Sequence, residues 1–226
     1  MSEADGVLQS FGASVPNSRT EAQKHSSTVG IVIATCWEAR PLLSRFHFVK
    51  IEKNLYQAEI TGRRVLLRVS GVGEAAAREA ASDLCRRGVG ELISAGFCGA
   101  LVPSLSVGDL VTERIASVSS PVRTPAERRA LTQRANAVAV DMETQAIVEV
   151  GTRRGVPIHV LRVVSDLMDD DLTPLFGCDQ GFSALRIAVR LVNPGVWPLA
   201  GRLRRHSAIA GARLADALDA YLHAAV

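Results

Sequence analysis

The sequence contains few aromatic residues and lacks the cysteine and histidine spacings that bind zinc. Aromatic residues make up 4% of the 226 residues, so a folded core must consist mainly of Val, Leu, Ile and Ala. The four cysteines form no CxxC pair, and the five histidines form no HExxH motif. We therefore predict reduced thiols and no metal site.

Long apolar runs are also absent. No stretch reaches eighteen apolar residues, so no membrane-spanning helix is predicted. Residues 1–28 are rich in Ser, Ala, Asn, Gln and Glu and lack the apolar segment with basic flanks that a signal peptide needs. We expect a cytoplasmic protein with a disordered tail at 1–28, followed by a single domain at 29–226.

Acidic residues are missing from the interval between Asp179 and Asp216, which contains six arginines. The carboxyl-terminal part, 182–226, is therefore basic, and its helical pattern breaks at 193–195. Apolar side chains alternate with the arginines, so 184–206 is suited to peripheral contact with an anionic membrane. The alternative is a pair of core-packing helices with solvated arginines. No nucleic-acid-binding motif is present.

Short apolar runs alternate with helical patterns along the rest of the chain. Helices are predicted at 73–87 and 142–153, and a last helix carries leucines four residues apart. The alternation predicts a three-layer αβα fold, with a mixed central sheet flanked by helices. Strands are predicted at 29–34, 65–69, 91–95, 109–112, 137–140 and 158–164.

Two carboxylates follow predicted strands, where ligands bind in open α/β sheets. Asp166 follows 158–164, and a carboxylate at the rim of an apolar strand is partly desolvated and suited to hold a proton. It could equally cap the next turn, with the aspartates of 169–171. Glu143 lies in the first predicted turn of 142–153, where it could bind a diol or simply stabilise the helix.

Two glycine-containing segments also follow strands. The loop GFCGA, 96–100, allows close approach of a ligand, although it could be only a tight turn. The segment SGVGEAA, 70–76, imitates a dinucleotide-binding fingerprint. That fingerprint needs an acidic residue at the end of the next strand, where this chain has Ser94-Ala95-Gly96, so we discount a dinucleotide site.

The ordered series SGVGEAAA, SAGFCGAL with PSLSVGDLV, AVAVDMETQAIVEVGTRRGVP and LRVVSD resembles the motifs of the nucleoside phosphorylase and nucleosidase family. The resemblance covers about 29–166. Within the family, WEAR and the basic segment FSALRIAVRLVNPGVWPLAGRLRRH are most similar to the hopanoid-associated phosphorylases, which release adenine from adenosylhopane. The resemblance implies a homodimer that uses no cofactor other than phosphate as a potential co-substrate.

The resemblance also assigns roles at an N-glycosidic bond. Asp166 matches the acid that protonates the leaving base, and Glu38 matches the acid that activates water in the nucleosidase branch. Arg40 is available to hold phosphate, so the choice between hydrolysis and phosphorolysis stays open. The matching substrate-binding residues are Glu143 at the ribose hydroxyls, Met142 on the sugar, Ser165 beside the acid, and Gly96, Phe97, Cys98 and Gly99 along the base and ribose.

Two departures from the family pattern affect what the chain is expected to do. Relatives have a few dozen more residues after the strand that ends near Thr112, so part of the pocket and of the dimer face is expected to be missing. Phe97 replaces a Ser or Thr, which favours an apolar substrate or weakens anion binding. We expect cleavage of an adenine-type nucleoside, with lipid-linked adenosylhopane among the candidate substrates. The alternatives are a methylthioadenosine or S-adenosylhomocysteine nucleosidase and a non-catalytic nucleoside- or partner-binding protein.

Overall fold

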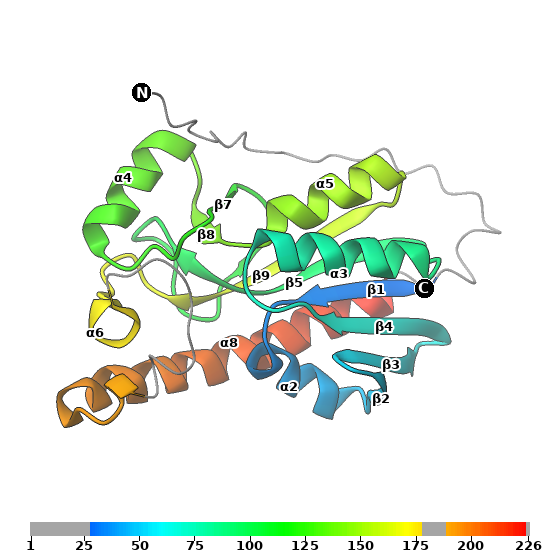
Figure 1. Cartoon of the computed structure of the whole chain (residues 1–226), viewed down its shortest axis with the longest axis horizontal. Coiled ribbons are helices and arrows are strands. Elements are labelled where there is room, and N and C mark those ends of the chain that lie inside the picture. Colours follow the sequence, from blue (N-terminus) through cyan, green and yellow to red (C-terminus); the bar gives the residue numbers. More distant parts are fainter. Residues whose placement is uncertain (1–27, 178–188, 225–226) are drawn as a thin grey trace.

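The computed structural model describes residues 28–177 and 189–224 (Figure 1). The predicted tail before Thr28 lies outside these ranges, as does the part of the basic segment at 178–188. Among the described helices, none is both long and apolar enough to cross a membrane.

A mixed sheet of nine strands forms the centre of the molecule. Its order is β2-β3-β4-β1-β5-β8-β7, and β9 pairs with both β5 and β6. The neighbours of β1 are parallel to it, as β9 is to β5, whereas β8 and β6 add antiparallel pairs. The strands are β1 (Val29–Ile33), β2 (Val49–Glu52), β3 (Leu55–Ile60), β4 (Arg63–Val69), β5 (Glu91–Ala100), β6 (Leu110–Val111), β7 (Ile115–Ser117), β8 (Ala139–Asp141) and β9 (Ile158–Asp166).

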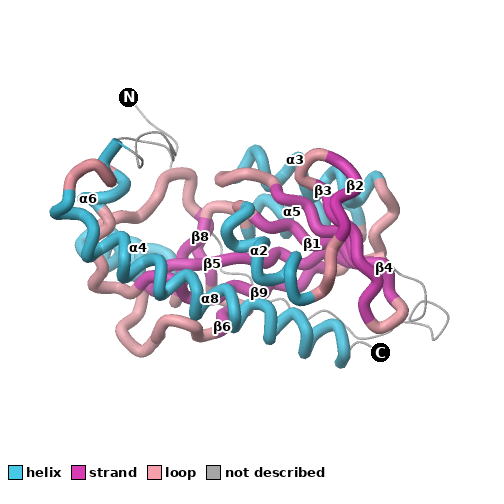
Figure 2. Tube along the Cα trace, turned by 90° about the horizontal axis from the view of Figure 1, so that it is seen from below, coloured by secondary structure: helices cyan, strands magenta, loops and turns pink. Residues whose placement is uncertain are grey.

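Helices cover both faces of this sheet. Helices α3 and α5 lie on one face, whereas α2 and α8 lie on the other, where α8 runs along β9 (Figures 1 and 2). Each face has its own buried apolar cluster. The three-layer αβα fold is thereby confirmed. The helices are α2 (Cys36–Arg45), α3 (Glu74–Arg86), α4 (Pro125–Ala135), α5 (Thr144–Arg154), α6 (Thr173–Phe176) and α8 (Trp197–Ala224), with a short 3-10 helix at Pro194–Val196.

The predicted elements are found with three corrections. Residues 96–100 are not a loop, because β5 continues through them and pairs with β8 and β9. Helix α5 begins at Thr144, so Glu143 is its N-cap residue and does not lie in the first turn. The strand predicted at 137–140 is β8, which begins at Ala139 and includes Asp141.

Candidate active site

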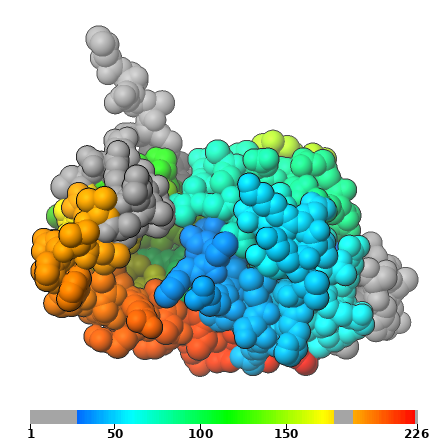
Figure 3. Space-filling view, turned by 60° about the horizontal axis from the view of Figure 1, so that its bottom comes forward, coloured from blue at the N-terminus to red at the C-terminus, as the bar shows by residue number. Residues whose placement is uncertain are grey.

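A hollow opens between α2 and the beginning of α8. Figure 3 shows it between the blue residues of α2 and the orange residues of α8, with green and yellow-green residues from the middle of the chain at its floor. The second half of β5 and the end of β9 come from that part of the chain. Most of the predicted site residues lie on α2, β5 and β9, and Met142 and Glu143 lie between β8 and α5.

Glu38 is fixed between the start of α2 and β5. Thr35 is the N-cap residue of α2, and its backbone N and hydroxyl both donate to Glu38 Oε2, at 2.8 and 2.7 Å. The other oxygen, Oε1, accepts from the backbone N of Phe97 at 2.8 Å. The side chain is only 7% exposed. The capping box of α2 thus orients this carboxylate toward β5.

Gly96 allows Glu38 and Arg162 to approach the same point of β5. A Cβ atom at this position would lie 2.6 Å from Arg162 Nη1 and 2.9 Å from Glu38 Oε1. Its φ of +150° also disfavours other residues. The glycine is therefore needed for two charged side chains to meet at the strand. Phe97, next to it, packs its ring toward the cluster between the sheet and α8.

Glu143 is buried beside Arg162 at the start of α5. Its Oε1 accepts from the backbone N of Gly73 at 2.8 Å, and its Oε2 lies 3.7 Å from Arg162 Nη1. Burial raises the pKa of Glu143, although the Arg162 charge opposes this rise. The segment that imitates a dinucleotide fingerprint therefore positions Glu143. Met142, the preceding residue, is half-buried.

Arg162 is a site residue that the sequence analysis did not single out. It is 1% exposed, and its Nε lies 2.9 Å from Asp141 Oδ2. Its guanidinium also donates to the hydroxyls of Thr144 and Ser94, each at 3.0 Å. Burial lowers the pKa of Arg162, but the surrounding carboxylates raise it by more. The pKa is therefore raised overall, and the group stays charged. One signal was available, because a lone arginine within the apolar strand IHVLRVV requires buried partners.

Asp166 is held at the end of β9 by two partners. Ser165 donates from its hydroxyl to Asp166 Oδ1 at 2.7 Å, as expected for a residue that orients it. Arg128, on α4, forms an ion pair with Asp166 Oδ2 and is itself buried. Arg128 was not identified from the sequence, because the helix that carries it, α4, was not predicted. Gly99 leaves room for this pair, because a Cβ atom there would lie 2.6 Å from Asp166 Oδ2.

Two polar groups therefore contact β5: Glu38, Arg162 and Glu143 near Gly96, and Arg128 and Asp166 near Gly99. Cys98 lies between them on the strand. Its charged neighbours include Arg162 and Asp141 on one side of the site and Arg128 and Asp166 on the other. Burial raises the pKa of its thiol well above the usual range, and its side chain packs in a buried apolar cluster with Val111 and Val164. The two groups contact β5 at Gly96 and Gly99, which are about 10 Å apart along an extended strand.

Arg40 is separated from the rest of the site. It is exposed, and its guanidinium lies 5.8 Å from the centre of the Trp37 ring. Glu38 is buried, and residues two apart on a helix point about 200° away from each other. Arg40 and Glu38 therefore lie on different faces of α2.

Comparisons with known proteins give the family and the fold of the chain. The family model described as the phosphorylase superfamily matches residues 28–114 and 111–180. The two segments overlap at residues 111–114, around the end of β6, where family residues are expected to be missing. No curated protein sequence matches the chain.

Solved structures with the same fold come from bacterial nucleosidases and a related hydrolase. A mutant 5'-methylthioadenosine/S-adenosylhomocysteine nucleosidase of Helicobacter pylori, with 5'-methylthioadenosine in its active site, has a TM-score of 0.65 at 18% identity, over 85% of this chain and 98% of that one. The Campylobacter jejuni nucleosidase has a TM-score of 0.61 at 17% identity, over 85% and 99%. The futalosine hydrolase of Helicobacter pylori also scores 0.61 at 17%, over 84% and 98%. These similarities establish the fold, and the family match establishes membership: the chain is an enzyme of the phosphorylase superfamily.

Proposed function

We propose that the protein cleaves the N-glycosidic bond of an adenine-type nucleoside. The observation that carries the proposal is that Glu143 and Asp166, distant in the sequence, belong to two polar groups that contact the same strand, β5, at Gly96 and Gly99. A nucleoside has its sugar and its base side by side, so it can engage both groups at once. The superfamily match and the nucleosidase fold support the same reaction class.

Each carboxylate then has a distinct role. Glu143 accepts hydrogen bonds from the ribose hydroxyls, with Met142 against the sugar. Asp166 donates a proton to the leaving base while Ser165 fixes its orientation. Protonation of the base as the bond lengthens lowers the barrier, because negative charge otherwise accumulates on the base. Gly96, Phe97, Cys98 and Gly99 line the space between them in this proposal.

In this proposal Glu38, rather than Arg40, serves the nucleophile. Glu38 is buried at β5 close to Arg162, whereas Arg40 lies over Trp37 on an exposed face of α2. A carboxylate at this position can accept a proton from an attacking water molecule. The placement therefore favours hydrolysis over phosphorolysis, and phosphate is not required as a co-substrate.

Measurement of adenine release with and without phosphate tests this proposal. We expect adenine to be released from adenosine-type substrates at the same rate in phosphate-free buffer and in about 10 mM phosphate, which is roughly ten times the highest KM values usual for enzymes. Free ribose derivatives, rather than ribose 1-phosphates, should accompany the adenine. A rate that depends on phosphate, with a sugar phosphate as product, would assign phosphorolysis and give Arg40 a role.

The substrate in this proposal carries a lipid tail, as adenosylhopane does. Support comes from exposed apolar side chains at the elements that border the hollow. Trp37 on α2 is 50% exposed, and Trp197 at the start of α8 is 59% exposed. Val189, Leu191 and Val192 precede Trp197 and are also exposed, with Arg204 and Arg205 exposed further along α8. Residues 189–206 are the part of the predicted membrane segment 184–206 that the structure describes.

We expect this segment to bind anionic membranes. Vesicles of phosphatidylcholine with 30% phosphatidylserine, a fraction on the order of that in anionic leaflets, should sediment the protein. Pure phosphatidylcholine vesicles should not.

The double variant Val192→Ser/Trp197→Ser should weaken binding, because it removes apolar surface that would enter the bilayer. The control Val49→Ser/Ile51→Ser changes two other exposed apolar residues, which lie on β2. Equal sedimentation of all variants would exclude this segment as the contact.

One contact favours a second candidate, binding of a nucleoside or partner without turnover. Arg128 forms an ion pair with Asp166 Oδ2, so this carboxylate oxygen is already occupied and is not free to transfer a proton to a leaving base. Tight binding of an adenine nucleoside without product would support this candidate. Methylthioadenosine or S-adenosylhomocysteine cleavage is the other enzymatic candidate, and the same adenine assay with these substrates distinguishes it. A homodimer remains part of the proposal, and light scattering tests it.

A further inference from the structure

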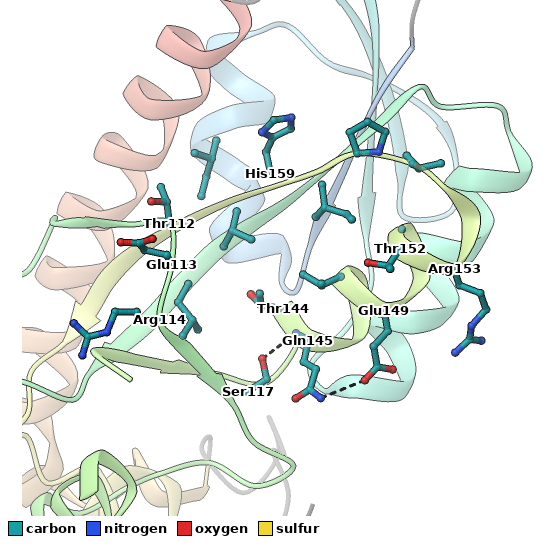
Figure 4. Close-up of a pocket in the computed structure, with 18 of the residues that line it drawn as sticks. Thr112, Glu113, Arg114, Ser117, Thr144, Gln145, Glu149, Thr152, Arg153 and His159 are labelled. Atoms are coloured by element: carbon teal, nitrogen blue, oxygen red, sulfur yellow. Dashed lines mark hydrogen bonds between the residues drawn. The ribbon is translucent and has the colours of Figure 1, made fainter. Parts of the chain in front are cut away.

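A groove of about 910 Å³ is lined by residues of α5, β7 and β9 and of the segment between β6 and β7 (Figure 4). Thr112, Glu113 and Arg114 are at one end, and Thr152 and Arg153 are at the other (Figure 4). Its walls are mainly apolar: they include Ile115, Val148, Val156, Ile158, Val160 and Leu161.

One edge of β9 forms the floor of this groove. β5 pairs with β9 along its whole length, but β6 has only two residues and pairs only with Arg162 and Val163. Within 28–177 and 189–224, no other strand pairs with β9. The side chains of β9 are accordingly buried from Leu161 to Val164 but only half-buried from Ile158 to Val160. Among the described residues, no strand therefore pairs with the outer edge of β9 at Ile158 and Val160.

The backbone polar groups of Ile158 and Val160 point into the groove. Val164 exchanges hydrogen bonds with Gly108 and Asp109 on the β6 side. Alternate residues of a strand direct their N–H and C=O groups to the same side, so Val160 and Ile158 direct theirs to that side too. Pro157 O bonds to Leu92 N on the opposite side, in agreement with this alternation. These groups need hydrogen-bond partners, which an apolar ligand could not provide.

The shape of the groove selects a single extended segment. α5 flanks the edge on one side and Tyr221 of α8 on the other. The same edge of a second copy would be recessed between its own helices, so two such edges could not reach each other. A single extended chain, antiparallel to β9 and in line with β6, satisfies the backbone groups and covers the apolar walls.

The chain itself has a suitable segment among the residues that the structure does not describe. Residues 7–15, VLQSFGASV, are the only apolar stretch before Thr28, and Phe11, Ala13 and Val15 alternate with small residues. Pro16 follows directly. An antiparallel arrangement would place Val7 toward the Arg114 end of the groove and Val15 toward Ile158.

The connection back to the described chain is long enough. Thr28 O accepts from Gly90 N at the end of the sheet where Pro157 contacts Leu92. The distance from β1 across β5 to the free edge of β9 is about 15 Å, or three strand spacings. Residues 16–27 can span at most about 40 Å when extended. A tethered segment also has a high effective concentration at the groove.

We propose that residues 7–15 bind in this groove as an added strand, antiparallel to β9 and in line with β6. The segment would then pair with its own domain through backbone hydrogen bonds. The interaction does not depend on the proposed activity. It covers the edge that a longer β6 would otherwise protect, at the place where the family match is divided.

Hydrogen exchange of the full chain tests this proposal, with Phe11→Asp/Val15→Asp as the disrupting variant. In the unmodified chain the amides of Ile158 and Val160 should be protected. The variant should accelerate their exchange by about tenfold or more, while amides of β1 and β4 keep their rates and show that the fold is intact. The control Asn17→Asp/Ser18→Asp adds the same charge outside the segment and should leave all rates unchanged.

Three outcomes would overturn the proposal. The first is rapid exchange of the Ile158 and Val160 amides in the unmodified chain, which would show that the edge is uncovered. The second is equal protection in the Phe11→Asp/Val15→Asp variant, which would assign the cover to another partner. The third is loss of protection when the protein is diluted a hundredfold, which would identify a second copy as the occupant.

Discussion

Replacement of Asp166 by Asn is expected to slow adenine release by about two to four powers of ten. Asn keeps the size of the side chain but cannot donate the proton that the leaving base requires. The expected loss is in turnover, since the other contacts to a nucleoside are unchanged. Release of adenine is followed by absorbance or chromatography, and nucleoside affinity is measured in parallel by calorimetry.

The controls must separate chemistry from stability, because Asp166 also neutralises the buried Arg128. A second variant, Asp166→Asn with Arg128→Gln, removes the unpaired charge, so a slow rate that persists in it belongs to the lost acid. Asp169→Asn changes a nearby carboxylate that is 76% exposed and pairs with Arg129. It should keep the original rate. Turnover of Asp166→Asn at the original rate would refute its role as the acid.

The layers of the fold could be predicted because buried parallel strands leave a strong local signal. Runs such as VGIVI are apolar at every position, and this pattern identified β1, β4, β5, β6, β8 and β9. β2 was missed because all four of its side chains are exposed. α4 was missed because the few buried side chains of PAERRALTQRA include a charged residue, Arg128, so it has no apolar face.

The candidate site was predictable only in part, because its geometry depends on pairing between distant segments. Glu143 and Arg162 are brought together by β9 and α5, and nothing in the nearby sequence specifies this contact. The glycines of GFCGA suggested a loop, but pairing with β8 and β9 makes the segment a strand. In a strand, Gly96 and Gly99 provide space for charged side chains of other elements. Backbone conformation favours glycine only at Gly96, whose φ is +150°.

Replacement of Arg162 by Met is expected to lower the free energy of unfolding by about 3–5 kcal/mol. Met has similar length and fits the apolar surroundings of β9, but it leaves Asp141 and Glu143 buried without their cation. Asp141 keeps bonds from Ser117 and Thr144, whereas Glu143 keeps bonds only from backbone N–H groups. Urea denaturation followed by circular dichroism gives the difference.

The exposed pair Arg129–Asp169 supplies the matched control. Arg129 is 59% exposed and lies 2.9 Å from its partner, so Arg129→Met should change the stability by less than about 1 kcal/mol. The contrast separates the loss of a buried counter-ion from the loss of any arginine. The double variant Arg162→Met/Glu143→Gln should recover part of the lost stability, because the amide that replaces the carboxylate carries no charge to leave unpaired. Equal stability of Arg162→Met and the parent would mean that the carboxylates find other partners, and Arg162 would then have no structural role in holding Glu143 at β5.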